Sequence, residues 1–215
     1  YEIPKRDWSS DVCSSDLHDP LTGVTNRDLL ILKLRDAIHH ADRHGFGVWV
    51  IFIDLDRFKQ INDQFGHAYG DQLLQVVAGR LSNSLRRDDV LARYGGDEFV
   101  LILRGGSDDY LTPQIIERLV ASVSEPIAIE GLELTITCSV GISTYPVDGR
   151  NAEELILQAD TAMYLAKESG HNRYQFYNEA IEAQLDQRAI VETELQHALD
   201  RKSTRLNSSH VSESR

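Results

Sequence analysis

Cysteine, positive charge and long apolar runs are all scarce in this sequence. Its two cysteines, Cys13 and Cys138, cannot build a disulfide framework of the kind that stabilises small secreted proteins. The longest apolar run, residues 48–53, is far short of the roughly 20 residues that span a bilayer. The amino terminus is polar and acidic, whereas a secretory signal is basic and then apolar. We therefore expect a cytoplasmic domain that makes no membrane contact.

Basic residues are outnumbered by acidic ones. Lys and Arg total 22 against 34 Asp and Glu, so the formal net charge is −12. Proteins that bind nucleic acid through its phosphates concentrate positive charge, and this composition argues against a nucleic-acid partner. A surplus of carboxylates suits a protein that holds Mg²⁺, although solubility explains most acidic chains. Hydrophobic residues at 41% and charged residues at 26% are ordinary for a folded globular protein.

The two ends of the chain differ in composition from the middle. Residues 7–16, within the leader of residues 1–17, and residues 202–215 are rich in serine and charge and lack a helical or strand period. The strings CSSDL and STRLNSSH resemble translated vector sequence. We exclude both ends from the fold prediction, whether they are foreign or ordinary disordered termini. The remaining pattern predicts one domain over residues 18–178 and a polar exit helix over residues 179–201.

Helical and strand patterns alternate through residues 18–178, which predicts an α+β domain. Asn151 is placed to cap the last helix of this domain, and Gly131 is expected in the turn of a hairpin. Residues 48–53, a continuous β-branched and aromatic run, have the pattern of a central strand covered on both faces. The predicted helices are residues 26–44, 69–85, 112–123 and 151–169. The predicted strands are residues 48–53, 90–94, 99–103, 126–130, 133–143 and 174–177.

Two carboxylates follow the predicted central strand. Asp54 and Asp56 are two residues apart, so in an extended chain they project to the same side. A carboxylate at the point where a buried strand emerges is a common metal ligand, because the backbone there is rigid. Taken alone, this segment is better explained as a strand-end turn or a helix cap.

The turn of the first predicted hairpin, residues 95–98, is Gly-Gly-Asp-Glu. Two glycines permit positive φ and leave no side chain in the way of a phosphate that approaches the main chain. Two acids follow directly at the tip. A solvent-exposed tight turn is the simpler alternative, but Asn-Gly or Asp-Gly would have served it equally well.

Asn62 and Asp71 lie on either side of the segment FGHAYG, between the central strand and the next predicted helix. Guanine presents two N–H donors on one edge and a carbonyl beside them, which a carboxylate and an amide can recognise. Without their neighbours, Asn62 is a turn residue and Asp71 a helix N-terminal residue favoured by the helix dipole.

In combination, these segments resemble the GGDEF domain of the diguanylate cyclase family. The resemblance covers residues 18–178 and keeps the order and spacing of the family's motifs throughout. The motifs that carry it are residues 18–23 (HDPLTG), 26–27 (NR), 52–59 (FIDLDRFK), 61–63 (IND), 65–67 (FGH), 70–71 (GD), 93–99 (RYGGDEF), 139–142 (SVGI), 159–160 (AD), 163–164 (MY), 166–167 (AK) and 170–173 (GHNR).

The resemblance implies a fold and a reaction. The fold is the nucleotide-cyclase, ferredoxin-like one, with a mainly antiparallel sheet of about five strands surrounded by helices and a GGDEF hairpin. The reaction condenses two GTP molecules into cyclic di-GMP and releases pyrophosphate, each 3′-hydroxyl attacking the α-phosphorus of the other nucleotide. Such in-line displacement needs charge neutralisation, so two Mg²⁺ (or Mn²⁺) ions are expected in each GTP site. Two identical substrates that meet head to tail imply a homodimer.

By the same resemblance, site residues fall into metal, catalytic and substrate-binding sets. His171 stands where Arg is commoner, so a weaker grip on the terminal phosphate is expected. The metal ligands are Asp54, the main-chain carbonyl of Leu55, and Asp97. The catalytic residues are Asp97 and Glu98, either of which could activate the hydroxyl, and Lys59. The substrate-binding residues are Asn62, Asp71 and, more weakly, His67 for guanine, with the main chain of Phe58 and Lys167 for the phosphates.

A regulatory site is also expected. Arg86 and Asp89 match the family's RxxD inhibitory motif, where cyclic di-GMP binds as product. Arg can hold a phosphate or a guanine edge through two hydrogen bonds, while Asp accepts guanine N–H groups. The alternative is a solvent-exposed charge run at the end of a helix.

A second function remains open on the sequence alone. The chain could be a catalytically silent module that binds GTP or cyclic di-GMP and regulates a linked EAL phosphodiesterase domain. Such modules usually lose the acids of the hairpin or of the metal strand, whereas Asp54, Asp97, Glu98 and Lys59 are all present here, which favours catalysis. Residues 176–199 resemble the linker between GGDEF and EAL domains, so we expect a longer protein with a sensor upstream and an EAL domain downstream. A free C-terminal helix is the alternative.

Overall fold

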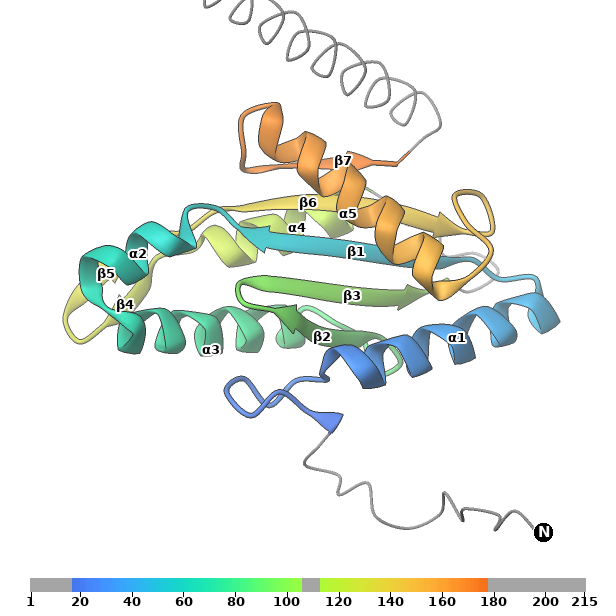
Figure 1. Cartoon of the computed structure of the whole chain (residues 1–215), viewed down its shortest axis with the longest axis horizontal. Coiled ribbons are helices and arrows are strands. Elements are labelled where there is room, and N and C mark those ends of the chain that lie inside the picture. Colours follow the sequence, from blue (N-terminus) through green and yellow to red (C-terminus); the bar gives the residue numbers. More distant parts are fainter. Residues whose placement is uncertain (1–16, 106–112, 178–215) are drawn as a thin grey trace, which may run out of the picture. The chain divides into compact units, whose positions relative to one another are not determined.

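The computed structural model describes residues 17–105 and 113–177, and within them it confirms the predicted α+β class. Five strands form one sheet with helices on both faces, and two short strands form a separate hairpin (Figure 1). No helix in the described ranges has the length and apolarity needed to cross a membrane. The predicted exit helix over residues 179–201 and both chain ends lie outside the described residues.

One buried strand organises the sheet. β1 (Val48–Leu55) is buried along almost its whole length and pairs antiparallel with β3 (Glu98–Arg104) and with β6 (Cys138–Tyr145). β2 (Val90–Gly95) extends the sheet beyond β3, and β7 (Arg173–Phe176) extends it beyond β6, giving the order β2-β3-β1-β6-β7. Only β7 runs parallel to its neighbour in this sheet, so the prediction of a mainly antiparallel sheet is confirmed.

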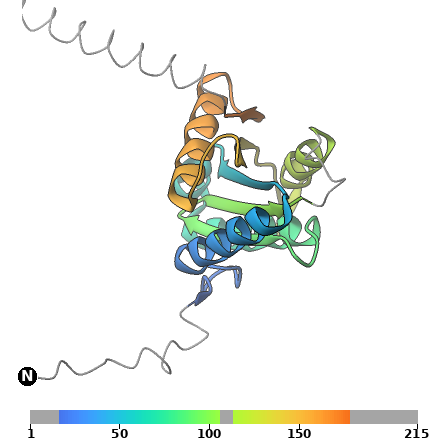
Figure 2. The ribbon, with the colours of Figure 1, turned by 90° about the vertical axis from the view of Figure 1, so that its right-hand side faces the viewer.

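Four helices cover the two faces. α1 (Arg27–His44) and α5 (Ala152–Glu168) lie on one face, and α3 (His67–Asn83) and α4 (Pro113–Ser124) lie on the other (Figure 2). The predicted helix over residues 112–123 is observed up to Ser124, and its residue 112 lies outside the described residues. Pro113 occupies the first turn, as predicted, where the missing N–H of proline costs nothing.

The alternation of side chains along β1 separates two hydrophobic cores. Val50 and Phe52 pack with α1 and α5, whereas Ile51, Ile53 and Leu55 pack with α3 and α4. Both faces of β1 are therefore apolar. A continuous hydrophobic run is the sequence pattern that such burial requires.

Asparagine caps fix the starts of α1 and α5. The side chain of Asn26 accepts a hydrogen bond from Leu29 N at 3.0 Å, and that of Asn151 accepts one from Glu154 N at 2.9 Å. Each bond satisfies an amide that the first helical turn leaves unpaired. Gly45, with φ 72°, ends α1 in the left-handed conformation.

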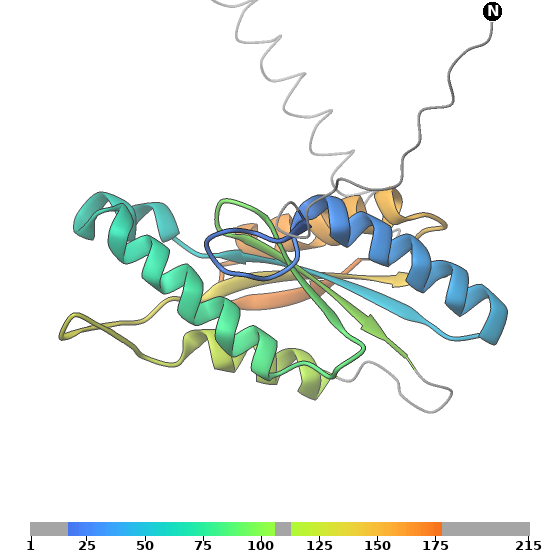
Figure 3. The same ribbon diagram turned by 90° about the horizontal axis from the view of Figure 1, so that it is seen from below.

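Two predictions about the elements were incomplete or wrong. α2 (Phe58–Phe65) was not predicted, and Phe58 is its one buried residue. The predicted strand over residues 133–143 is two strands: β5 (Leu132–Leu134), which pairs with β4 (Ile127–Ile129) across Gly131, and β6. Figure 3 shows the β4–β5 hairpin projecting beside the beginning of α3.

The interruption before β6 has a clear cause. Asp56 N donates to the carbonyl of Thr137 at 2.9 Å, and the Thr137 hydroxyl donates to the Asp56 carboxylate at 2.6 Å. These bonds take the chain out of the hairpin and into register with β1, where Cys138 lies beside Leu55. The Cys138 side chain is fully buried, as predicted, and burial, with the nearby Asp56 and Asp54 charges, raises the pKa of its thiol to about 12.

Close packing of α5 on β6 depends on Gly141. A Cβ atom at this position would lie 1.9 Å from the carbonyl oxygen of Ala159 and 2.2 Å from the amide nitrogen of Met163. We expect Gly141→Ala to lower the free energy of unfolding by about 3 kcal/mol, at the upper end for overpacking, because the obstructing atoms are backbone. Urea denaturation of the 215-residue chain measures this loss.

The same substitution at Gly79 is a matched control. Gly79 lies inside α3, and a Cβ there has no heavy atom within 4 Å. Gly79→Ala is expected to stabilise the chain by roughly 0.5–1 kcal/mol through helix propensity. Equal unfolding free energies for the two variants would contradict the packing argument.

Candidate active site

The predicted metal and catalytic acids meet at one end of the sheet. In the β1–β3 register Asp54 lies opposite Glu98, and Leu55 N donates to the carbonyl of Asp97 at 3.3 Å. Gly96, at the tip of the β2–β3 hairpin, has φ 46°, which lets the chain turn back tightly. The ladder that pairs two buried strands therefore also holds the acids together.

A cation from α5 joins this group. Lys167 Nζ lies 2.7 Å from Asp54 Oδ2, and the Asp54 side chain is only 11% exposed. Lys167 was predicted to bind the outer phosphates of a substrate. In the structure it forms an ion pair with Asp54, which places its ammonium beside the acids.

Burial and mutual repulsion raise the pKa of the clustered carboxyls. Burial is the main cause for Asp54, with contributions from Asp97 and Asp56 and an opposing effect of Lys167. The pKa of Glu98 is raised first by burial and then by the charges of Asp54, Asp160 and Asp97. Burial likewise raises the pKa of Asp160, a residue of α5 to which the sequence analysis gave no role. In the sequence, the Ala-Asp motif at residues 159–160 was the only indication that Asp160 belongs near the site.

The chemistry of this cluster fits a hard divalent cation. In the described part of the chain no three His, Cys, Asp or Glu side chains are arranged to hold a metal by themselves. Mg²⁺ is usually bound by one or two carboxylates, with water and substrate phosphates completing its coordination. Asp54 and Asp97 with the Leu55 carbonyl supply such a partial set. A cation there would relieve the repulsion that raises the pKa of Asp54 and Glu98.

The turn after β1 leads directly into the first turn of α2. Arg57 has φ 59°, and no side chain caps the first turn of α2. The amides of such a turn point outward and favour an anion. Lys59 is exposed in this turn, and Phe58 is buried beneath it, so the predicted phosphate-binding residues share one segment.

Asn62, predicted to read guanine, has an unsatisfied oxygen. Its Oδ1 is buried and has no hydrogen-bond partner among the described residues. Leaving such an atom unpaired costs about 1–3 kcal/mol, so a ligand N–H donor would be favoured there. A Cβ on Gly70 would lie 2.0 Å from this oxygen, so the glycine in α3 makes the space that Asn62 occupies.

The other two predicted guanine residues lie on α3. His67 begins the helix and Asp71 follows four residues later, so both side chains are exposed on the same helical face. The first turn of α3 holds no acid, and Asp71 lies beyond it. The helix-dipole explanation of Asp71 therefore loses its basis.

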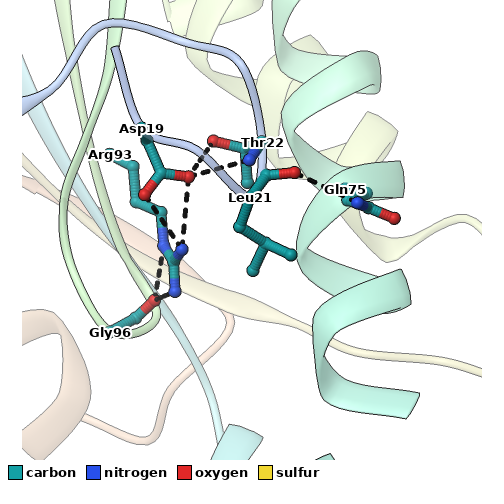
Figure 4. Close-up of polar contacts among 6 residues, drawn as sticks. All are labelled: Asp19, Leu21, Thr22, Gln75, Arg93 and Gly96. Carbon is teal, nitrogen blue, oxygen red and sulfur yellow. Dashed lines mark hydrogen bonds and ion pairs between the residues drawn. The ribbon is translucent and has the colours of Figure 1, made fainter. Parts of the chain in front are cut away.

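Arg93 clamps the hairpin to the segment before α1 (Figure 4). Its Nε and Nη2 donate to the carbonyl of Gly96 at 2.9 and 2.7 Å, and its Nη1 lies 3.2 Å from both carboxylate oxygens of Asp19. Asp19 also accepts bonds from the amide and hydroxyl of Thr22. Burial raises the pKa of Asp19, but these bonds from Thr22 and Arg93 together bring it below its ordinary value.

Arg86 and Asp89, the predicted inhibitory pair, form a turn between α3 and β2. The carboxylate of Asp89 accepts from the amide of Arg86 at 2.9 Å. A cavity of about 120 Å³ adjoins both residues and is also lined by Arg104 of β3 and Arg118 of α4. These two arginines were not predicted, since nothing in the sequence links their distant positions to this turn.

We expect Arg93→Met to lower the free energy of unfolding by about 1–3 kcal/mol, because it leaves the partly buried Asp19 and the Gly96 carbonyl without their shared donor. Amide hydrogen exchange at Asp97 and Glu98 should accelerate as the hairpin loosens. Denaturation and exchange measured by NMR test both effects.

Arg35→Met is the control for this prediction. Arg35 pairs with Glu153 on the surface, where both side chains are more than half exposed, and such pairs contribute at most about 1 kcal/mol. A hairpin that exchanges equally fast in both variants would contradict a clamping role for Arg93.

Comparison with known proteins agrees with this geometry. The family model described as "Diguanylate cyclase, GGDEF domain" matches residues 16–173. The bifunctional diguanylate cyclase/cyclic di-GMP phosphodiesterase MucR of Pseudomonas aeruginosa is 42% identical over 187 residues, which cover 86% of this chain and 27% of MucR. The chain thus spans about a quarter of the length of this curated relative.

Solved structures show the same likeness. The isolated GGDEF domain of TpbB (YfiN) from Pseudomonas aeruginosa has a TM-score of 0.75 at 35% identity, covering 79% of this chain and 99% of that one. The GGDEF domain of DgcB from Caulobacter crescentus, in complex with c-di-GMP, has a TM-score of 0.69 at 28% identity and covers 74% of this chain and 95% of that one. On the family match and these likenesses, the chain belongs to the GGDEF family of diguanylate cyclases.

Proposed function

We propose that this chain condenses two GTP molecules into cyclic di-GMP and pyrophosphate. The observation that carries the proposal is the meeting of Asp54, Asp97 and Glu98 at the end of the sheet, beside Lys167. The buried, unpartnered oxygen of Asn62 supports a ligand with N–H donors, as guanine has. Family membership supports the same activity.

Each part of the site has a separate task in this reaction. Asn62 and Asp71, with His67 beside them, would receive the guanine edge, and the amides of the turn at Phe58 would hold phosphate together with Lys59 and Lys167. Asp54, the Leu55 carbonyl and Asp97 would hold Mg²⁺ or Mn²⁺, which would supply charge neutralisation at the phosphate oxygens and would favour ionisation of the attacking hydroxyl.

The reaction needs a group that accepts the proton of the attacking 3′-hydroxyl, and an acid of the hairpin would do so. The 3′-oxygen of one nucleotide forms a bond to the α-phosphorus of the other, and the bond from that phosphorus to the bridging oxygen of pyrophosphate breaks. Asp97 or Glu98 accepts the hydroxyl proton. Because each protomer would hold one GTP, both bonds of the product form across a homodimer.

A silent regulatory module is the second candidate. MucR, as its name states, is both a diguanylate cyclase and a cyclic di-GMP phosphodiesterase, and a linked EAL domain would make this chain one part of such a protein. A module without activity has no need for the paired acids. The assembled cluster of Asp54, Asp97 and Glu98 therefore favours the cyclase.

The direct test is incubation of the concentrated chain with GTP and Mg²⁺, with products separated by chromatography. We expect cyclic di-GMP from the unaltered chain and a loss of at least about 100-fold in Asp97→Ala, corresponding to roughly 3 kcal/mol of transition-state stabilisation. The substitution removes both a metal ligand and a possible base. The matched control is Asp36→Ala, at an exposed acid of α1, which should retain full activity.

The outcomes separate the two candidates. Tight binding of GTP or cyclic di-GMP without product would favour the regulatory module. Product formation by Asp97→Ala at the same rate as by Asp36→Ala would show that the hairpin acids are not the catalytic ones.

We also propose that cyclic di-GMP binds at Arg86 and Asp89 and inhibits the enzyme. The arginines around the adjoining cavity give this surface positive charge on an otherwise acidic chain, which suits a phosphodiester. Arg86→Ala should weaken cyclic di-GMP binding, measured by calorimetry, by at least about tenfold, the effect of losing a charge-assisted hydrogen-bond pair. Arg87→Ala, at the exposed neighbour, is the control, and equal losses in both variants would contradict a specific site.

A further inference from the structure

Asp56 is a buried carboxylate to which neither the resemblance nor the proposed reaction gives a task. It is 5% exposed and follows the metal strand directly. Its Oδ1 accepts from the Ser139 hydroxyl at 2.7 Å, and its Oδ2 accepts from the Thr137 hydroxyl at 2.6 Å and from Asn172 N at 3.0 Å. Both oxygens are therefore occupied by donors from the protein, unlike those of Asp54, which face a lysine and other acids.

The bond from Asn172 joins two segments that the sequence keeps far apart. One is the turn after β1 that continues into Arg57 and Lys59. The other is the loop between α5 and β7, residues 170–172, which reaches Asp56 through the amide of Asn172. A cavity of about 430 Å³ is lined by both segments, including Arg57 and His171.

The loop adopts a conformation that needs external support. Gly170, His171 and Asn172 have φ values of 121°, 60° and 48°, all in the region that residues other than glycine rarely adopt. Nδ1 of His171 lies 2.8 Å from the carbonyl oxygen of Lys167, which ties the loop back to the end of α5. The bond from Asn172 to Asp56 is the link from this loop to the strand that carries the acids.

We propose that Asp56 is a positioning residue for the triphosphate of GTP. By holding the 170–172 loop against the turn after β1, it fixes where His171 stands relative to that turn. Guanine recognition by Asn62 and Asp71 depends on the contact between α2 and α3 and does not pass through Asp56. The assignment rests on the proposed function, since it presumes that GTP binds here.

The consequence is a selective loss of affinity. In Asp56→Ala the amide of Asn172 loses its acceptor, and His171, the neighbouring loop residue, loses its fixed position. Affinity for GTP should fall more than affinity for GMP, because GMP lacks the two outer phosphates. A change confined to stability would lower the active fraction and leave the ratio of the two affinities unchanged.

The experiment measures this ratio by calorimetry on the whole 215-residue chain with Mg²⁺. The ligands are GMP and a GTP analogue with a methylene group between the α- and β-phosphorus, which prevents turnover. We expect Asp56→Ala to lower the ratio of analogue affinity to GMP affinity by at least about tenfold, as loss of a supporting hydrogen bond does in comparable sites. Asp56→Asn, which fills the same space with one acceptor fewer, should lower the ratio by about threefold.

Ser139→Ala is the matched control. It removes one donor to the same carboxylate and leaves the bond from Asn172 in place. Its ratio should stay within about twofold of that of the unaltered chain, whatever stability it loses. If Asp56→Ala fails to fold by circular dichroism, Asp56→Asn decides the question.

Two results would overturn the assignment. One is an unchanged ratio in the folded Asp56 variants, or an equal fall in Ser139→Ala, which would leave Asp56 a stabilising residue only. The other is an unaltered chain that binds neither ligand. That result would contradict the proposed function itself, because Asp56 would then have no bound triphosphate to position.

Discussion

The register of β1 against its neighbours is the constraint on which the site depends. Asp54 faces Glu98 because β1 pairs with β3 at this register, and Leu55 lies beside Cys138 because β1 pairs with β6. A slip of one residue would exchange side chains between the two cores and turn Asp54 away from Glu98. Tight packing on both faces opposes such a slip. Hydrophobic packing therefore sets the geometry of the acids.

Bringing these acids together destabilises the folded state, and other contacts of the fold offset part of this cost. Burial raises the pKa of Asp54, Glu98 and Asp160, which means that their charged forms are less favourable here than in water. Lys167 offsets part of this at Asp54. It can do so because α5 lies close against β6, an approach that the missing side chain of Gly141 permits. Local destabilisation retained within a well-packed scaffold is typical of functional sites.

Features set by neighbouring residues could be predicted from the sequence, and features set by distant contacts could not. The cap at Asn151 and the buried run of β1 follow local rules, and both are confirmed. α2 escaped prediction because it is eight residues long, and the spacing of Phe58, Ile61 and Phe65 was its only signal. The prediction of a single strand over residues 133–143 was wrong, because the chain changes its pairing partner at the point where Thr137 contacts Asp56. No local sequence pattern encodes that contact.

The same distinction governs the site. Asp54 and Asp56 look equivalent in the sequence, two carboxylates at one strand end that project to the same side. Contacts make them different: Asp54 faces Lys167 among acids that repel it, whereas Asp56 is surrounded by three donors from two distant segments. A carboxylate whose protein donors already satisfy it gains little from a new ligand, and one held among like charges gains much from a cation. The chemistry of each acid is thus decided by what the fold brings to it, and that is why motif spacing finds the pair but cannot assign its two roles.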